Sequence, residues 1–253
     1  MKTSIHLPSI GLGLLLAGCI VASLAMQSTS FQTALPRLTL EQAEILSHMS
    51  IVHLPDGQAG MCKAIRISGV NVQVVNGLGS TATKNGLGNV IVGYLEAGLP
   101  LGDDRTGSHN IVGGTLNSYS SWGGLVAGRG NTVGAPWASV SGGAANLAGA
   151  PDSSVGGGYL NHVTGNYGWA AGGGQNVVYG EYGSACGGSL NSVGGINALV
   201  SGGVQNLSDG DASTISGGES NRSSGTRSSV SGGFQRIANG IHNWVGGSPF
   251  EQF

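Results

Sequence analysis

A short motif, Gly-Gly-x-x-Asn, recurs every 15 residues in the C-terminal half of this 253-residue chain. Periodicity this strict is typical of proteins in which one small structural unit stacks on the next. With less regular copies before and after, nine units cover residues 113 to about 246. The motif residues of the regular copies are Gly142, Gly143 and Asn146; Gly157, Gly158 and Asn161; Gly172, Gly173 and Asn176; Gly187, Gly188 and Asn191; Gly202, Gly203 and Asn206; and Gly217, Gly218 and Asn221. A last copy has Gly232 and Gly233, with Arg236 in place of the asparagine.

Two positions in each unit are regularly apolar and lie seven residues apart. One column comprises Val133, Ala148, Val163, Val178, Val193 and Ala238, interrupted by Ser208 and Ser223. The other comprises Val140, Val155, Ala170, Ala185, Val200, Ile215, Val230 and Val245. We therefore expect two short strands per coil that face each other across a thin apolar interior. The predicted fold is all-β, a narrow parallel β-roll or solenoid of about nine 15-residue coils.

Glycine and asparagine are expected to have structural roles in this roll. The glycine pair is predicted to form one bend, because glycine adopts positive φ angles without steric cost. A second bend is predicted near another glycine column, represented by Gly165, Gly180, Gly195, Gly210, Gly225 and Gly240. The asparagines follow the first bend, and we expect their stacked amides to hydrogen-bond from coil to coil.

The N-terminal segment has the features of an export signal. Lys2 precedes a mostly apolar stretch over residues 10–25, so residues 1–25 are predicted to be a signal peptide. Two endings remain open, and an uncleaved anchor is a third alternative. Residues 16–19 (LAGC) resemble a bacterial lipobox, in which Cys19 would be lipidated, whereas residues 23–25 (SLA) fit ordinary cleavage before Met26. Both endings predict a bacterial protein located outside the cell or in the cell envelope.

The remaining segments are divided by their local patterns. We expect a leader with a short helix over residues 26–62, a β-rich cap or neck over 63–112, the roll over 113–247 and a tail over 248–253. The helix is predicted to begin at Thr39, which forms a capping box with Gln42. Alternating apolar residues from Ile65 to Val74, interrupted at Gly69, predict a bent strand or a strand, turn and strand.

Composition argues against several functional classes. Charged residues make up 9% of the chain and the net charge is -2, so the basic surface of a nucleic-acid-binding protein is not expected. No phosphate-binding loop motif occurs, and we expect no cofactor. The acidic and basic residues of the repeat are scattered over different columns, which argues against a catalytic site and against an enzyme.

Two other groups of residues were considered as chemical sites. The loop at Asp103, Asp104 and Arg105, with His109 nearby, is the densest charge cluster, and we interpret it as a solvated turn at the start of the roll. Cys186 occupies a column of small residues, and no His or acidic cluster accompanies it or Cys62, so no metal site is predicted. Whether these two cysteines pair is left open.

Aromatic residues are the best candidates for a ligand-binding surface. They are Tyr159, Tyr167, Trp169, Tyr179, Tyr182 and Trp244. Their rings could stack on sugar faces, or they could pack between neighbouring rolls. The preferred function is an exported structural or adhesin-like surface protein without catalytic activity. The alternative is a carbohydrate-binding or polysaccharide-processing β-helix protein.

The thin interior also bears on oligomeric state. Two buried Val-sized side chains per coil contribute little compared with the entropy lost on ordering fifteen residues. We therefore expect additional burial between copies of the chain, in a homo-oligomer with a trimer preferred.

Residues 210–218 (GDASTISGG) and 225–233 (GTRSSVSGG) resemble the head repeats of trimeric autotransporter adhesins, the YadA-like family. Residues 66–77 and 102–110 also resemble uncharacterised secreted bacterial proteins that carry the same Ser-Gly-Gly-x-x-Asn repeats. The resemblance implies a left-handed parallel β-roll, three chains around one axis and an unidentified ligand on a host or matrix surface. No adhesin-type stalk or membrane anchor follows the repeat, so membrane attachment is expected only through lipidation of Cys19.

Overall fold

The computed structural model describes residues 38–94, 96 and 103–247. The chain forms two compact units, one that ends at Val72 and one that begins at Gln73. We describe each unit by itself.

The first unit contains one helix and one β-hairpin. Helix α2 spans Leu40–Ser47, and the predicted capping box is present, with Gln42 N donating to Thr39 Oγ1 at 3.1 Å and Thr39 N donating to Gln42 Oε1 at 2.9 Å. Strand β1 (Met49–Pro55) pairs with antiparallel strand β2 (Met61–Ile67). Strand β1 was not predicted from the sequence. The strand predicted after Gly69 does not form. Strand β2 ends at Ile67, and residues 70–75 are not in a strand.

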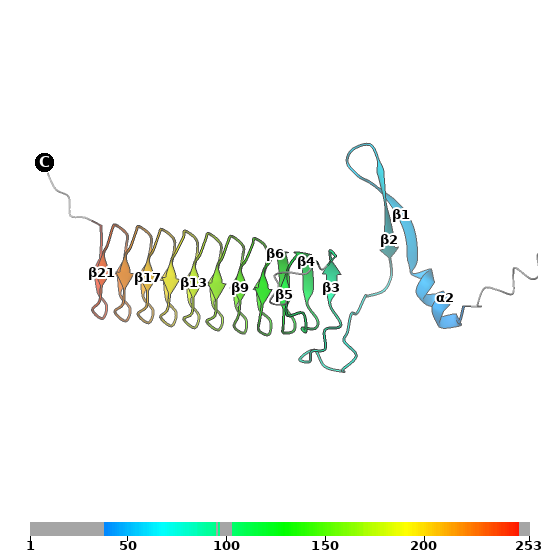
Figure 1. The fold of residues 1–253 in the computed structure, drawn as a ribbon, viewed down its shortest axis with the longest axis horizontal. Helices are drawn as coiled ribbons and strands as arrows, with labels where there is room; N and C mark the ends of the chain where they lie inside the picture. Colours follow the sequence, from blue (N-terminus) through cyan, green and yellow to red (C-terminus); the bar gives the residue numbers. More distant parts are fainter. Residues whose placement is uncertain (1–37, 95, 97–102, 248–253) are drawn as a thin grey trace, which may run out of the picture. The chain divides into compact units, whose positions relative to one another are not determined.

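The second unit is the predicted parallel β-roll, in which successive coils stack side by side (Figure 1). Two sheets of 11 and 9 strands run along it. The first sheet contains β3 (Val90–Val92), β4 (Ile111–Thr115), β6 (Leu125–Arg129), β8 (Ser139–Val140), β10 (Ser154–Val155), β12 (Trp169–Ala170), β14 (Ser184–Ala185), β16 (Leu199–Val200), β18 (Thr214–Ile215), β20 (Ser229–Val230) and β22 (Trp244–Val245). The second sheet contains β5 (Ser118–Tyr119), β7 (Thr132–Val133), β9 (Leu147–Ala148), β11 (His162–Val163), β13 (Val177–Val178), β15 (Ser192–Val193), β17 (Leu207–Ser208), β19 (Arg222–Ser223) and β21 (Ile237–Ala238).

Each regular coil contributes one strand to each sheet. Strand residues pair with the residues 15 positions later, as Val155 does with Ala170 and Val163 does with Val178. We call the connection from a first-sheet strand to the second-sheet strand that follows it the first turn, and the connection onward to the next coil the second turn. The predicted arrangement of two short strands per coil is therefore confirmed.

The core lies between the two sheets and consists of the two predicted apolar columns. The inward side chains are buried, except for Val245 in the last strand, which is partly buried, and Ile215 is the largest of the fully buried ones. Ser208 and Ser223 also point inward and are buried. Because each two-residue strand has one inward and one outward residue, the interior of the regular coils is only two side chains thick.

The roll also extends upstream of the sequence repeat. Strand β3 pairs in parallel with β4, and Val90 lies beside Ile111. The two strands therefore belong to the first sheet, although the sequence motif begins only at Gly113. Residues 63–112, expected to form one neck, are thus shared between the hairpin and the roll.

Candidate functional site

The two glycines of each motif have different structural roles. Gly173 has a φ of +82°, and a Cβ atom there would overlap the carbonyl oxygen of Gly188 in the next coil. Gly172 is outside the left-handed region, and a Cβ atom would meet nothing within 4 Å. In this coil only the second glycine is therefore required for the first turn, whereas the sequence predicted that the pair was needed. In the last copy the first glycine, Gly232, also has a positive φ, of +135°.

Glycines of the second turn are required for a different reason. Gly180 is outside the left-handed region, but a Cβ atom would overlap the backbone of Gly194 and Gly195. The residue with a positive φ in this turn is not a glycine. Tyr167 and Tyr182 are two examples, with φ of +57° and +56°. Close coil stacking, more than turn conformation, therefore explains the second glycine column.

The asparagine column joins successive coils. Asn176 N donates to Asn161 Oδ1 at 3.0 Å, while its Nδ2 donates to the carbonyl oxygens of Gly172 at 3.0 Å and Gly188 at 3.1 Å. One side chain thus connects three coils. The buried members of the column are Asn117, Asn131, Asn146, Asn161, Asn176, Asn191, Asn206 and Asn221. The column ends at Arg236, whose N donates to Asn221 Oδ1 at 2.8 Å.

These contacts leave the asparagine side chains with few hydrogen-bonding groups that a ligand could reach. Each amide is buried and hydrogen-bonded to the backbone, as buried polar groups require. The glycine and asparagine columns therefore form the scaffold, and a binding surface must come from the outward side chains.

Three of the six candidate aromatics lie on the second turn. Tyr167 and Tyr182 occupy equivalent positions in successive coils, and their rings are stacked with centroids 4.8 Å apart and an interplanar angle of 5°. Tyr179 leads into the same turn as Tyr182. Trp169 faces outward on β12, two residues after Tyr167, and its register neighbours are Ser154 and Ser184. Residues 167–182 thus bring exposed rings to one edge of the roll.

The other two candidates lie apart from this group. Tyr159 is on the first turn, where it pairs with Ala144 and Gly174. Trp244 is on β22, and its indole Nε1 donates to Ser231 Oγ at 2.8 Å. The structure therefore does not bring all six predicted residues into one site.

Three exposed aromatic residues, Tyr94, Trp137 and Phe234, were missed by the sequence analysis. Trp137 is 56% exposed and occupies the same turn position as Tyr167, two coils earlier. It makes an edge-to-face contact with Trp122, with centroids 6.5 Å apart. The 30-residue separation between Trp137 and Tyr167 is twice the repeat, and that spacing could have identified it.

The charged loop between β3 and β4 makes contacts within itself and with neighbouring segments, such as the hydrogen bond from Ser118 Oγ to Asp104 O at 2.9 Å. Arg105 Nη2 lies 2.6 Å from Asp103 Oδ2, and Thr106 donates its hydroxyl and its N–H to Asp104 Oδ1 at 2.7 and 3.0 Å. These hydrogen bonds, the hydroxyl first, lower the pKa of Asp104 below its ordinary value. The His109 ring accepts the N–H of Asn76 at Nε2, 3.2 Å away, and its Nδ1 lies 3.1 Å from Thr81 O. These contacts hold the loop in place and join it to residues 76–81.

Cysteine and metal chemistry are also limited in the described part of the chain. Cys62 and Cys186 are exposed and are not in a disulfide. Cys19, the candidate lipidation site, lies outside the described residues. Within residues 38–94, 96 and 103–247, no group of three or more His, Cys, Asp or Glu side chains could hold a metal ion. The same residues contain no helix long and apolar enough to cross a membrane.

Comparison with known proteins assigns no family. No protein-family model matches the chain, and no curated protein matches it.

Proposed function

We propose that this protein is an exported structural or adhesin-like rod of the bacterial surface or extracellular space, with no catalytic activity. The repeat supplies a rigid scaffold, and outward side chains supply whatever recognition the rod performs. We retain homo-oligomerisation as part of this proposal; the adhesin resemblance implies a trimer, and the measurement of solution mass described below distinguishes a trimer from a dimer.

This proposal is supported by a difference between the two residues of each second-sheet strand. The outward residue changes in chemical type from coil to coil, whereas the inward residue stays small and buried. Consecutive coils of the second sheet present His162, Val177, Ser192, Leu207 and Arg222 at equivalent outward positions. The inward positions of the same coils stay small and buried, as Val163, Val178, Val193, Ser208 and Ser223, and every coil keeps its asparagine. A fold that fixes its stacking contacts but varies its outward chemistry suits a display scaffold, whereas catalysis requires converging functional groups.

Surface location can be tested on intact cells of the source bacterium. Antibodies against the roll should label unpermeabilised cells or detect the protein in the medium, and added protease should remove the cell-bound signal. A cytoplasmic control protein should stay unlabelled and intact. Recovery of the roll only in the cytoplasmic fraction would contradict the proposal.

The mode of export can be tested separately at Cys19. If the lipobox is used, radioactive palmitate should label the wild-type protein and not Cys19→Ser. Cys62→Ser is the matched control and should keep the label. Unlabelled wild-type protein with a mature N-terminus at Met26 would identify ordinary secretion.

Glycan binding is a second candidate, and the Tyr167 and Tyr182 stack favours it. Exposed rings in neighbouring coils, with Trp169 close in sequence, provide flat apolar surfaces beside polar serines. Aromatic rings of this kind combine apolar faces with polar edges. A purified roll on a glycan array should bind a defined sugar class, and Tyr182→Ala or Trp169→Ala should remove that binding. Phe234→Ala, an exposed aromatic of the first turn, is the control. Binding lost equally in the control would contradict this site.

A further inference from the structure

The first unit exposes large apolar side chains and has no core of its own. None of residues 38–72 is buried, although they form a helix and a paired hairpin. A two-stranded hairpin is marginally stable in water unless further strands or helices cover an apolar face. This unit therefore requires a covering surface.

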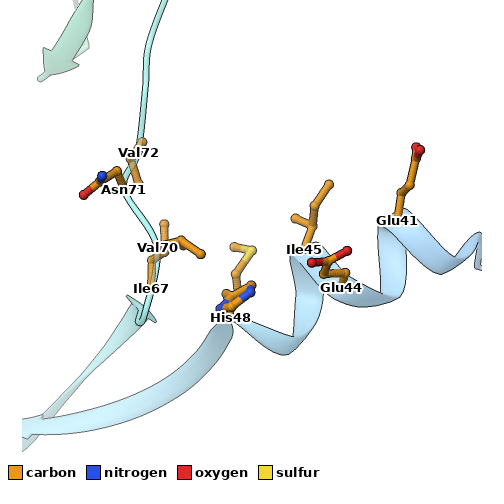
Figure 2. Close-up of a pocket in the computed structure, with 9 residues that line it drawn as sticks. Glu41, Glu44, Ile45, His48, Ile67, Val70, Asn71 and Val72 are labelled. Carbon is orange, nitrogen blue, oxygen red and sulfur yellow. The ribbon is translucent and has the colours of Figure 1, made fainter.

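One face of the hairpin carries most of this apolar surface. Met49 pairs with Ile67, and Ile51 pairs with Ile65, so the four side chains share one face. They are 38%, 44%, 63% and 63% exposed, respectively. Met49 and Ile67 also line a groove of about 580 Å³ between α2 and residues 70–72. Figure 2 shows Ile67, Val70 and Val72 on one side of this groove and α2 on the other. We call these four side chains and the groove the hairpin face.

The segment that follows the hairpin also lacks partners. Val70, Val72 and Val74 alternate with polar residues, as in a half-buried strand, yet all three are exposed. Among the described residues, no backbone hydrogen bond involves residues 70–75. Val70 and Val72 line the groove beside Ile67. The same place thus combines an uncovered apolar face with an unpaired strand-like segment.

Charges at the two ends of the hairpin face indicate what covers it. Glu41 and Glu44 border the groove at the helix end. His53 and Lys63 form the next pair beyond Ile51 and Ile65, towards the hairpin tip. A second copy placed antiparallel would put its Lys63 opposite Glu44 and its isoleucines opposite Met49 and Ile67.

We infer that the hairpin face binds the hairpin face of a second copy of this chain in an antiparallel pair. A parallel arrangement around a three-fold axis would bring identical charges to the same level, which is unfavourable. The pair also supplies the apolar cover that the isolated unit lacks. The inference is independent of where the protein is located and of what the roll binds.

The first test is the solution mass of the full chain by light scattering across a concentration series. The wild type should reach twice the chain mass. Ile51→Glu should weaken pairing by at least about 100-fold, because it buries a charge in the interface. Leu54→Glu places the same charge on the opposite face of β1 and should pair like the wild type. Circular dichroism should show an intact roll in both variants.

A charge exchange tests the antiparallel orientation. Lys63→Glu and Glu44→Lys should each weaken pairing about three-fold, and the double variant should regain wild-type affinity. A wild type that is monomeric or trimeric, an Ile51→Glu variant that stays paired, or a double variant weaker than both single ones would overturn the inference. If the wild type is a monomer, hydrogen exchange at residues 49–52 will show whether its own chain protects them. None of these outcomes changes the test of surface location.

Discussion

The hydroxyl oxygens of Ser208 and Ser213 lie 2.6 Å apart inside the roll, where both side chains are fully buried. The equivalent residues one coil earlier are Val193 and Ala198. The next coil repeats the polar pair, with Ser223 Oγ and Ser228 Oγ 2.7 Å apart. Serine interrupts the apolar column only where a second serine supplies a hydrogen-bond partner.

This pairing predicts strong coupling between the two positions. Ser208→Val or Ser213→Ala alone should destabilise the roll by about 1–3 kcal/mol, because each leaves one buried hydroxyl without its partner. The double variant has the same side chains as Val193 and Ala198 one coil earlier. It should therefore regain most of the stability that each single variant loses. Urea denaturation of all four proteins provides the double-mutant cycle. Additive losses would show that the two hydroxyls act independently.

A second prediction distinguishes the two glycines of one motif. Gly173→Ala should destabilise the roll by more than about 2 kcal/mol, because its φ is +82° and the new methyl overlaps the next coil. Gly172→Ala is the matched control one residue earlier, with open space at its Cβ. It should be neutral or stabilise the roll by up to about 1 kcal/mol, since alanine reduces the entropy of the unfolded chain. Thermal melts of the two variants should therefore move differently, and equal shifts would refute the assignment.

The sequence was sufficient for the roll because the same physical requirement recurs in every coil. A single Val or Asn is a weak signal, but Val163, Val178 and Val193 at constant spacing predict stacked inward positions. Strand β1 offers no such repetition. Its apolar residues point to both faces and none is buried, so the sequence pattern of Met49–Pro55 gave no clear period. Periodic stacking was predictable, while pairing within the unrepeated hairpin was not.

The charged loop between β3 and β4 should show a pH response at Asp104. The Thr106 hydroxyl, its backbone N–H and the charge of Lys84 favour the carboxylate, so the folded pKa lies below 3.8. The associated stabilisation is present above that ordinary value and is lost as the pH falls through the folded pKa. Thr106→Val removes the largest contribution and should raise the pKa towards 3.8, as measured by NMR titration. Thr132→Val, on β7, should leave the Asp104 titration unchanged.

The candidate surface was only partly predictable, since spacing identifies residues on one edge but not their contacts. Tyr167 and Tyr182 differ by one repeat, and the same reasoning would have added Trp137. The positive φ at these non-glycine positions had no sequence signal, because Trp137, Asp152 and Arg227 share it with different side chains. Only the coil geometry explains it: Tyr167 N donates to Pro151 O in the preceding coil at 3.1 Å.

The asparagine column supports a final prediction about how coils are held together. Asn176→Asp keeps an acceptor for Asn191 N, 3.0 Å from Oδ1, but loses the Nδ2 donor to Gly172 and Gly188. A carboxylate there would be buried beside carbonyl oxygens, which favours its neutral form and raises its pKa. The free energy of unfolding of the variant should therefore be lower than that of the wild type by about 3 kcal/mol or more at pH 7. Stability should recover as the pH falls and the acid is protonated. Gln175→Glu, the exposed preceding position, is the control and should show no such recovery. Urea denaturation at pH 7 and pH 4.5 measures the difference, and equal losses at both values would contradict a buried donor role for Asn176.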